Sequence, residues 1–136
     1  MTDPAPKKKK KKKQKAYLWG QGAEWLASLL LRIKGYRILA RRFKCKSGEI
    51  DLIARKGNMI CFIEVKARAG RHQALHALSR RQQQRIIRAA EWYLARNMPD
   101  GQGNSSGTDC RFDIMAVEPW HLPTHVKDAW QKDIRI

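Results

Sequence analysis

The sequence predicts one small α/β domain in which helices flank a small mixed β-sheet. Three observations lead to this fold class: the length of the chain, its composition and the order of its elements. A chain of 136 residues, of which 43% are hydrophobic, can bury one core. The apolar periodicity predicts a helix, three strands, a second helix and a fourth strand, in that order. Such an order is typical of a mixed sheet with helices packed on its faces.

The predicted domain covers residues 16–136 and begins with a helix and a strand. Residues 17–34 carry apolar side chains at near-helical spacing, the last of them Ile33, which predicts an amphipathic helix. Gly35 is a natural end for this helix. Residues 36–43 combine apolar and basic side chains and are interpreted as the first strand.

The second helix and the last strand follow a polar, basic connection over residues 68–76. Ser79 is a typical N-cap residue, and apolar spacing continues from there to about residue 97. Residues 111–117 are interpreted as the fourth strand. Two prolines then bracket a turn, and a short helical turn is expected over residues 126–131.

Residues 48–66 predict a β-hairpin, because two alternating apolar runs of strand length flank the loop at residues 56–58. The glycine and asparagine of this loop tolerate the positive φ that tight hairpin loops need. With a three-residue loop, Asp51 lies opposite Ile63, one position from Glu64. A one-residue change in loop length would bring the two carboxylates side by side. The sequence leaves this register open.

Two acids and a lysine, Asp51, Glu64 and Lys66, stand at the ends of these two apolar strands. Strand interiors disfavour such residues, and buried charges are costly unless they are paired or bind a metal. One interpretation is a half-exposed hairpin with a solvated face and an ion pair between Glu64 and Lys66. The other is a divalent-metal site with two hard oxygen ligands and Lys66 beside the attacking water or the phosphate.

The chain is strongly basic, with a formal net charge of +17. Residues 1–15 contain seven consecutive lysines and predict a disordered arm, because like charges repel and nothing apolar is there to bury. This arm carries +7, so the remaining chain carries +10. Charge of this sign and size favours binding to a polyanion, but it does not distinguish DNA, RNA and anionic lipid surfaces. Non-specific contact with nucleic acid is the favoured role of the arm.

Composition argues against several other classes of protein. No apolar run approaches the ~18–20 residues of a membrane span, and the N-terminus lacks the pattern of a secretory signal. The cysteines, Cys45, Cys61 and Cys110, are widely spaced and indicate neither a disulfide framework nor a zinc site. We therefore expect a cytoplasmic protein without an integral membrane segment.

Two further features each have a structural and a functional interpretation. Glu24 is the only acid of the first helix; it either favours the start of that helix or points at the strand carboxylates. The first turns of the second helix carry Arg80, Arg81, Arg85 and Arg88, which form either a solvated face or a phosphate contact.

Several segments of the chain resemble a known family. The central stretch resembles the PD-(D/E)xK nuclease core of restriction endonucleases and archaeal Holliday-junction resolvases. More closely, the chain is similar to the YraN family, an uncharacterised bacterial family assigned an endonuclease-like fold. The segments that carry the resemblance are Gly22-Ala-Glu-Trp-Leu-Ala27, Gly35-Tyr-Arg-Ile-Leu39, Gly48-Glu-Ile-Asp-Leu-Ile-Ala54, Phe62-Ile-Glu-Val-Lys-Ala-Arg68, Ala89-Ala-Glu-Trp-Tyr-Leu94 and Arg111-Phe-Asp-Ile114.

This resemblance implies a restriction-endonuclease-like domain and a set of site residues. Asp51 and Glu64 match the two acids of the motif and would bind Mg²⁺ or Mn²⁺, with the Val65 carbonyl as a further ligand. Lys66 matches the motif lysine, and Glu24 falls where related nucleases have an acid. Two departures are Ile50, which replaces the motif proline, and Gln82, which replaces a lysine often found in the family.

The implied function is metal-dependent hydrolysis of phosphodiester bonds in DNA, including branched DNA. The alternative is a non-catalytic nucleic-acid-binding protein with the same fold. Resolvases of similar fold are dimers, so the analogy also implies a homodimer. The residues expected to contact nucleic acid are Lys7, Lys8, Lys9, Lys10, Lys11, Lys12 and Lys13 of the arm, with Arg68, Arg81 and Arg85 in the domain.

Overall fold

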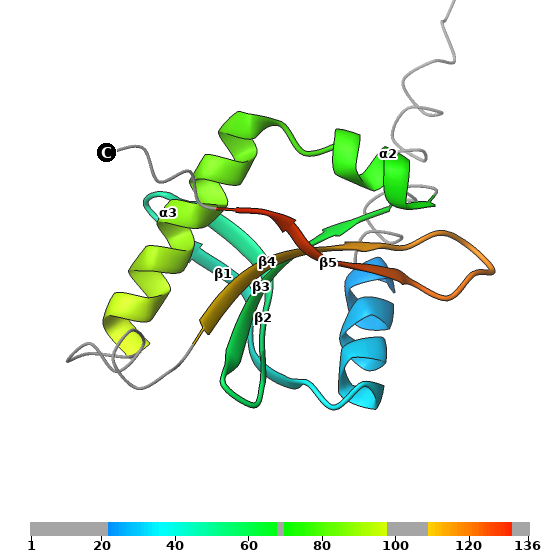
Figure 1. Ribbon diagram of the computed structural model, residues 1–136, viewed down its shortest axis with the longest axis horizontal. Helices are drawn as coiled ribbons and strands as arrows, with labels where there is room; N and C mark the ends of the chain where they lie inside the picture. Colours follow the sequence, from blue (N-terminus) through cyan, green and yellow to red (C-terminus); the bar gives the residue numbers. More distant parts are fainter. Residues whose placement is uncertain (1–21, 68–69, 98–108, 132–136) are drawn as a thin grey trace, which may run out of the picture.

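A five-stranded mixed sheet forms the centre of the computed structural model, which describes residues 22–67, 70–97 and 109–131 (Figure 1). The lysine arm and Arg68 lie outside these residues. In sequence order the elements are a first helix over residues 22–33, β1 (Arg37–Cys45), β2 (Gly48–Lys56), β3 (Met59–Lys66), α2 (Gly70–His76), α3 (Arg80–Asn97), β4 (Asp109–Ala116) and β5 (Thr124–Trp130). The structure is thus a single α/β domain, as predicted, and is compatible with a restriction-endonuclease-like fold.

The strands lie in the same order in the sheet as in the sequence. All neighbouring pairs are antiparallel except β3 and β4, which are parallel. Parallel neighbours need a long crossover, and α2 and α3 provide it. The connection at residues 68–76, expected only to be polar and basic, therefore contains a helix of its own.

The β2–β3 hairpin has a two-residue loop, and this settles the register that the sequence leaves open. Lys56 pairs with Met59, so the loop is Gly57 and Asn58, and Gly57 has a φ of 59°. A positive φ at the first loop residue is what tight hairpin turns require and what glycine adopts at no steric cost. Of the two registers that the sequence leaves open, the three-residue loop is thereby excluded.

The short helical turn expected at residues 126–131 is also wrong, because this segment belongs to β5. It pairs antiparallel with β4, with Val126 opposite Ile114 and Trp130 opposite Phe112. Without β5, one edge of β4 would leave a row of buried backbone groups unpaired, which is costly. Val126 and Trp130 are buried in the core.

Apolar layers cover both faces of the sheet, and Figure 1 shows α3 and the first helix on opposite sides of it. The layer beneath α3 includes Ile53, Phe62, Ile86, Tyr93 and Phe112. The layer beneath the first helix includes Ala27, Leu31, Leu52, Cys61 and Ile63. Ile33, the last residue of the predicted apolar stripe, is instead 74% exposed, because residues 23, 27 and 31 form the buried face.

The start of α3 is a capping box, which the N-cap prediction for Ser79 anticipated in part. The Ser79 hydroxyl accepts a hydrogen bond from the Gln82 backbone N–H at 3.1 Å, and the Gln82 side chain accepts one from the Ser79 N–H at 3.0 Å. Both backbone donors would otherwise lack a partner within the helix. Gln82 is thus part of the helix start.

We expect Ser79→Ala to lower the free energy of unfolding by about 1 kcal/mol, the usual cost of losing an N-cap. Urea unfolding followed by circular dichroism measures this difference. Gln84→Ala, at an exposed position on the same helix, is the matched control and should change the value by less than about 0.5 kcal/mol. An equal effect of both variants would contradict the capping role.

Candidate metal and phosphate site

Asp51 on β2 and Glu64 on β3 lie side by side in the sheet. Leu52 pairs with Ile63, and continuing this register by one residue puts Asp51 opposite Glu64. The backbone N–H of Val65 donates a hydrogen bond of 2.8 Å to the Asp51 carboxylate, which fixes the orientation of that side chain. The two carboxyl groups are close enough for each to affect the pKa of the other.

This pair of acids holds a proton more tightly than isolated carboxyl groups do. Burial and the charge of Asp51 raise the pKa of Glu64 to about 8, against a smaller opposing effect of Lys66. Burial also raises the pKa of Asp51, although the Val65 N–H opposes it. Two carboxylates in contact cannot both ionise without a nearby cation. The pair is therefore an unfavourable place for two negative charges and a favourable one for a cation.

Lys66 forms an ion pair with Glu64. Its Nζ lies 3.6 Å from the Glu64 carboxylate, and both side chains are less than 20% exposed. Glu64 and Lys66 are two residues apart on β3, so the strand geometry puts them on the same face. The ion pair that the sequence suggests is present, within a largely buried site.

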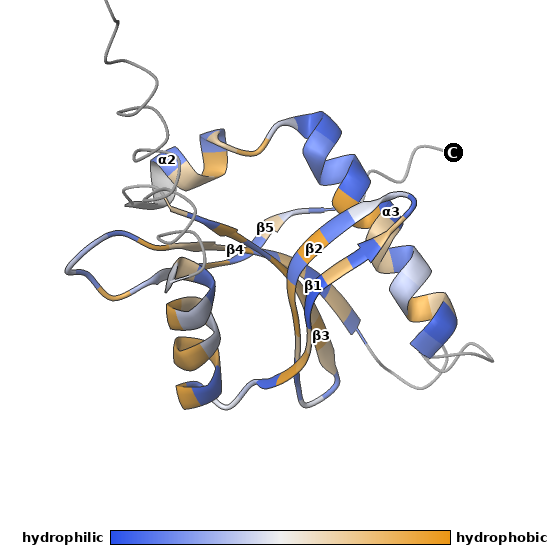
Figure 2. Cartoon of the chain, turned by 180° about the vertical axis from the view of Figure 1, so that it is seen from behind, coloured by the Kyte–Doolittle hydropathy of each residue, from blue (hydrophilic) through white to orange (hydrophobic). Residues whose placement is uncertain are grey.

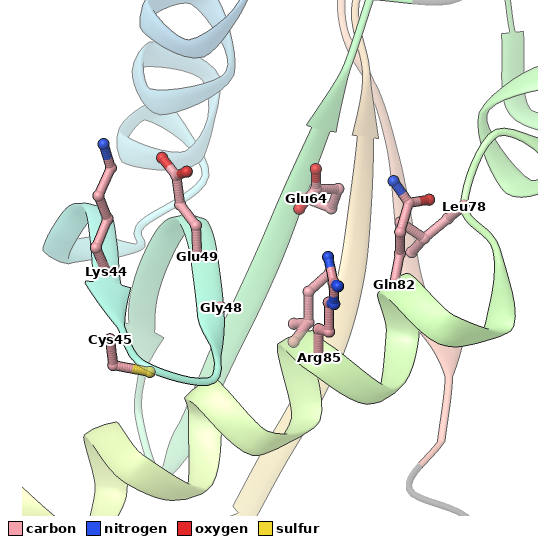
Figure 3. Close-up of a pocket in the computed structure, with 9 residues that line it drawn as sticks. Lys44, Cys45, Gly48, Glu49, Glu64, Leu78, Gln82 and Arg85 are labelled. Carbon is pink, nitrogen blue, oxygen red and sulfur yellow. The ribbon is translucent and has the colours of Figure 1, made fainter.

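A pocket of about 430 Å³ opens beside Glu64, between the sheet and the first turns of α3 (Figure 3). Lys44 and Arg85 supply its positive charge, and Glu49 is a further acid in its wall. Figure 3 shows Arg85 on the side of α3 that faces Glu64. The close approach of α3 needs glycine at position 48, where a Cβ would lie 3.3 Å from the Arg85 carbonyl oxygen.

Glu24 lies on the first helix near the pair, but an arginine holds it. Its carboxylate forms a 2.9 Å ion pair with Arg42 on β1. Its charge still acts on Asp51, where it contributes to the raised pKa. Within the residues that the structure describes, no group of three or more acids, histidines or cysteines is arranged to hold a metal. The carboxylates in direct contact are thus Asp51 and Glu64.

The predicted nucleic-acid contacts fall into three sets. Arg85 lines the pocket beside Glu64. Arg81 is exposed on the same helix, one turn earlier, and is not part of the pocket wall. Arg68 and the lysine arm lie outside the described residues, so their contacts stay predictions.

The most deeply buried charge among the described residues is that of Asp113 on β4, which was not among the predicted site residues. Asp113 is fully buried and accepts two hydrogen bonds from the Arg111 guanidinium, at 2.8 and 2.9 Å. Arg111 also donates to the Tyr36 hydroxyl, and the Asp128 backbone N–H donates to Asp113. The only sequence signal was an apolar strand interrupted by Arg and Asp two residues apart.

His125 completes this buried network. Its Nε2 lies 2.7 Å from the Asp113 carboxylate, and its Nδ1 lies 2.8 Å from the Lys34 ammonium. An ammonium can only donate, so Nδ1 accepts and Nε2 carries the proton. Burial would raise the pKa of Asp113, but the hydrogen bonds from His125, Arg111 and Asp128 lower it to about 2. This network joins β4, β5 and the end of the first helix.

Comparisons with known proteins show where this chain belongs. A model of the uncharacterised protein family UPF0102 matches residues 23–117. A UPF0102 protein of Mesorhizobium japonicum is 46% identical over 117 residues, which cover 86% of this chain and 90% of the relative. The chain belongs to family UPF0102. The resemblance to the YraN family is thereby confirmed, since YraN and UPF0102 denote the same family.

Other UPF0102 relatives are similar over most of their length. One from Rhodopseudomonas palustris is 47% identical over 129 residues, covering 95% of this chain and 91% of the relative. One from Paramagnetospirillum magneticum is 45% identical over 124 residues, covering 88% and 92%. The segment that matches the UPF0102 model contains both Asp51 and Glu64 and also Asp113. Across the described part of the chain, no helix has the length and apolarity to cross a membrane.

Proposed function

We propose that this UPF0102 protein hydrolyses phosphodiester bonds of nucleic acid, most readily DNA, with the help of a divalent cation. The observation that carries this proposal is the partly buried pair Asp51 and Glu64 with Lys66 beside it. The raised pKa values of both acids mean that ionising the two carboxyl groups together is unfavourable when no cation is bound. A bound cation would offset this unfavourable charge.

The residues fit Mg²⁺ or Mn²⁺ better than a softer metal. Both donors are carboxylate oxygens, which these cations prefer, and water and phosphate oxygens commonly fill their remaining positions. The Val65 carbonyl remains a proposed further ligand. When bound, such a cation would lower the pKa of a coordinated water and offset charge on the phosphate.

The surrounding side chains have separate roles in this proposal. Lys66, 3.6 Å from Glu64, would exchange that partner for a phosphate oxygen or the attacking water once Glu64 binds a cation. There it would stabilise the negative charge that develops in the transition state. Arg85 and Lys44 in the pocket wall would hold the phosphate backbone and orient the scissile bond.

The proposal is tested on linear, single-stranded, flapped and four-way-junction DNA, and on RNA, each in EDTA, Mg²⁺ or Mn²⁺. We expect cleavage with metal and none in EDTA, and a rate at least 100-fold lower for Asp51→Asn. Asp109→Asn, an exposed acid at the other end of β4, is the control. If the wild type binds nucleic acid and cuts no substrate in the panel, the protein is a non-catalytic nucleic-acid-binding module instead.

A further inference from the structure

The outer face of α3 carries a stripe of cationic and aromatic side chains that begins at the pocket. Arg85, Arg88, Trp92 and Arg96 follow one another at intervals of three or four residues, so they share one face of the helix. The three arginines are exposed. Five arginines and one glutamate, Glu91, give the helix a net charge of +4, and its first turns are blue in Figure 2.

The far end of this stripe is a stacked pair. The guanidinium carbon of Arg96 lies over the Trp92 ring, 3.7 Å from its centroid, which is a stacking distance. The pair is one turn of helix long, and it lies at the protein surface because Arg96 is exposed and Trp92 is partly exposed. Such surfaces bind unpaired nucleobases, because every base has a π face that can stack on tryptophan or on a guanidinium plane.

A shallow hollow of about 520 Å³ surrounds this pair, and it meets the pocket at the β1–β2 turn. Ser47 of that turn lines the hollow together with Arg88, Trp92 and Arg96. The next residue, Gly48, lines the pocket that contains Glu64. The pocket and the hollow therefore lie on the two sides of one turn, and a single chain of phosphates could follow the helix from one to the other.

We infer that α3 holds an unpaired strand of nucleic acid, with Arg85 and Arg88 on its phosphates and one base stacked on Trp92 and Arg96. The inference rests on the proposed function in one respect, which is that the bound strand runs along α3 toward Glu64. It would reach Glu64 through the pocket that Arg85 lines. Arg85 and Arg96 are eleven residues apart, about 16 Å at the rise of an α-helix. This length suits a strand of a few nucleotides.

The aromatic pair decides between an unpaired strand and a duplex. The bases of a duplex already stack on each other, so Trp92 can add little to duplex affinity, whereas phosphate contacts serve both forms equally. Glu91 lines the same hollow, and its negative charge opposes anion binding there. The proposed phosphate contacts therefore end at Arg88, and a base rather than a phosphate would occupy the hollow. DNA and RNA single strands share this chemistry.

The test measures binding of fluorescent oligo(dT), oligo(rU) and duplex DNA by anisotropy, in EDTA, to the full chain carrying Glu64→Gln. We expect Trp92→Leu to weaken single-strand binding by about 5- to 150-fold, the usual range for a lost base–aromatic stack, and duplex binding by less than about 2-fold. Trp92→Phe should restore most of the affinity.

Arg85→Ala/Arg88→Ala should reduce the slope of log K against log[salt] by about 1.4 for single strands.

Matched controls are residues that line neither the pocket nor the hollow. Trp25→Leu removes a 58% exposed tryptophan, and Arg32→Ala/Arg37→Ala removes two exposed arginines. These controls should leave single-strand binding unchanged, and the lysine arm contributes equally to every variant. Trp92→Leu binding like Trp25→Leu, or an equal loss for duplex and single strand, would overturn the inference. Because no cleavage is measured, its failure is distinct from failure of the proposed catalysis.

Discussion

Asp113→Asn is expected to lower the free energy of unfolding by about 3 kcal/mol or more. The change leaves Arg111 and His125 with a neutral partner in a fully buried place. Breaking a buried ion pair by removing one charge typically costs about 3–5 kcal/mol, because the other charge stays desolvated. Urea unfolding at pH 7 measures the loss. Asp109→Asn, at an exposed position on the same strand, is the control and should cost less than about 0.5 kcal/mol.

The same residue predicts a pH dependence with a definite sign. The pKa of Asp113 is about 2 in the folded chain and about 3.8 in the unfolded one. Its ionised form therefore stabilises the fold above pH 3.8, and this contribution is lost as the pH falls from 3.8 to 2. Asp113→Asn should remove that part of the acid sensitivity. An unchanged stability difference between wild type and variant across this window would show that Asp113 does not titrate as the network requires.

Lys66→Ala is expected to reduce the cleavage rate by at least 100-fold while leaving metal binding in place. The lysine stabilises developing charge in the proposed site, and removing one such donor typically costs that much. Single-turnover cleavage at saturating Mn²⁺ measures the chemical step. Lys66→Arg should recover part of the rate, since it keeps the positive charge. Lys127→Ala, at an exposed position on β5, is the control. A Lys66→Ala rate within about 3-fold of wild type would exclude this role.

Local patterns predicted most of the elements, and long-range pairing decided the rest. The start of the helix after Ser79 follows from capping and is confirmed. Periodicity predicted a strand at residues 111–117, and the structure has it at Asp109–Ala116. The helical turn predicted at residues 126–131 was wrong because the seven residues of β5 show too little periodicity to distinguish a turn of helix from a strand. This segment is a strand because it pairs with the edge of β4, and the local sequence does not show that such an edge is available.

The candidate site shows the same division. The alternation of Asp51, Glu64 and Lys66 with apolar neighbours predicted which residues form the site and roughly where they lie. The sequence did not predict that Asp51 and Glu64 lie side by side, because this depends on whether the hairpin loop has two or three residues. The network around Asp113 joins residues up to 91 positions apart in sequence, and only the packed sheet brings them together.

Asp51 and Glu64 are proposed to bind one divalent cation, and calorimetric titration of the metal-free protein with Mn²⁺ measures this binding. The pKa of Glu64 near 8 predicts release of a proton on binding at pH 7, and tighter binding at pH 8.5. Buffers of different ionisation enthalpy count that proton. One saturable site, lost in Glu64→Gln and in Asp51→Asn, is the expected result. Absence of saturable binding at millimolar Mn²⁺, or binding that persists in both variants, would contradict it.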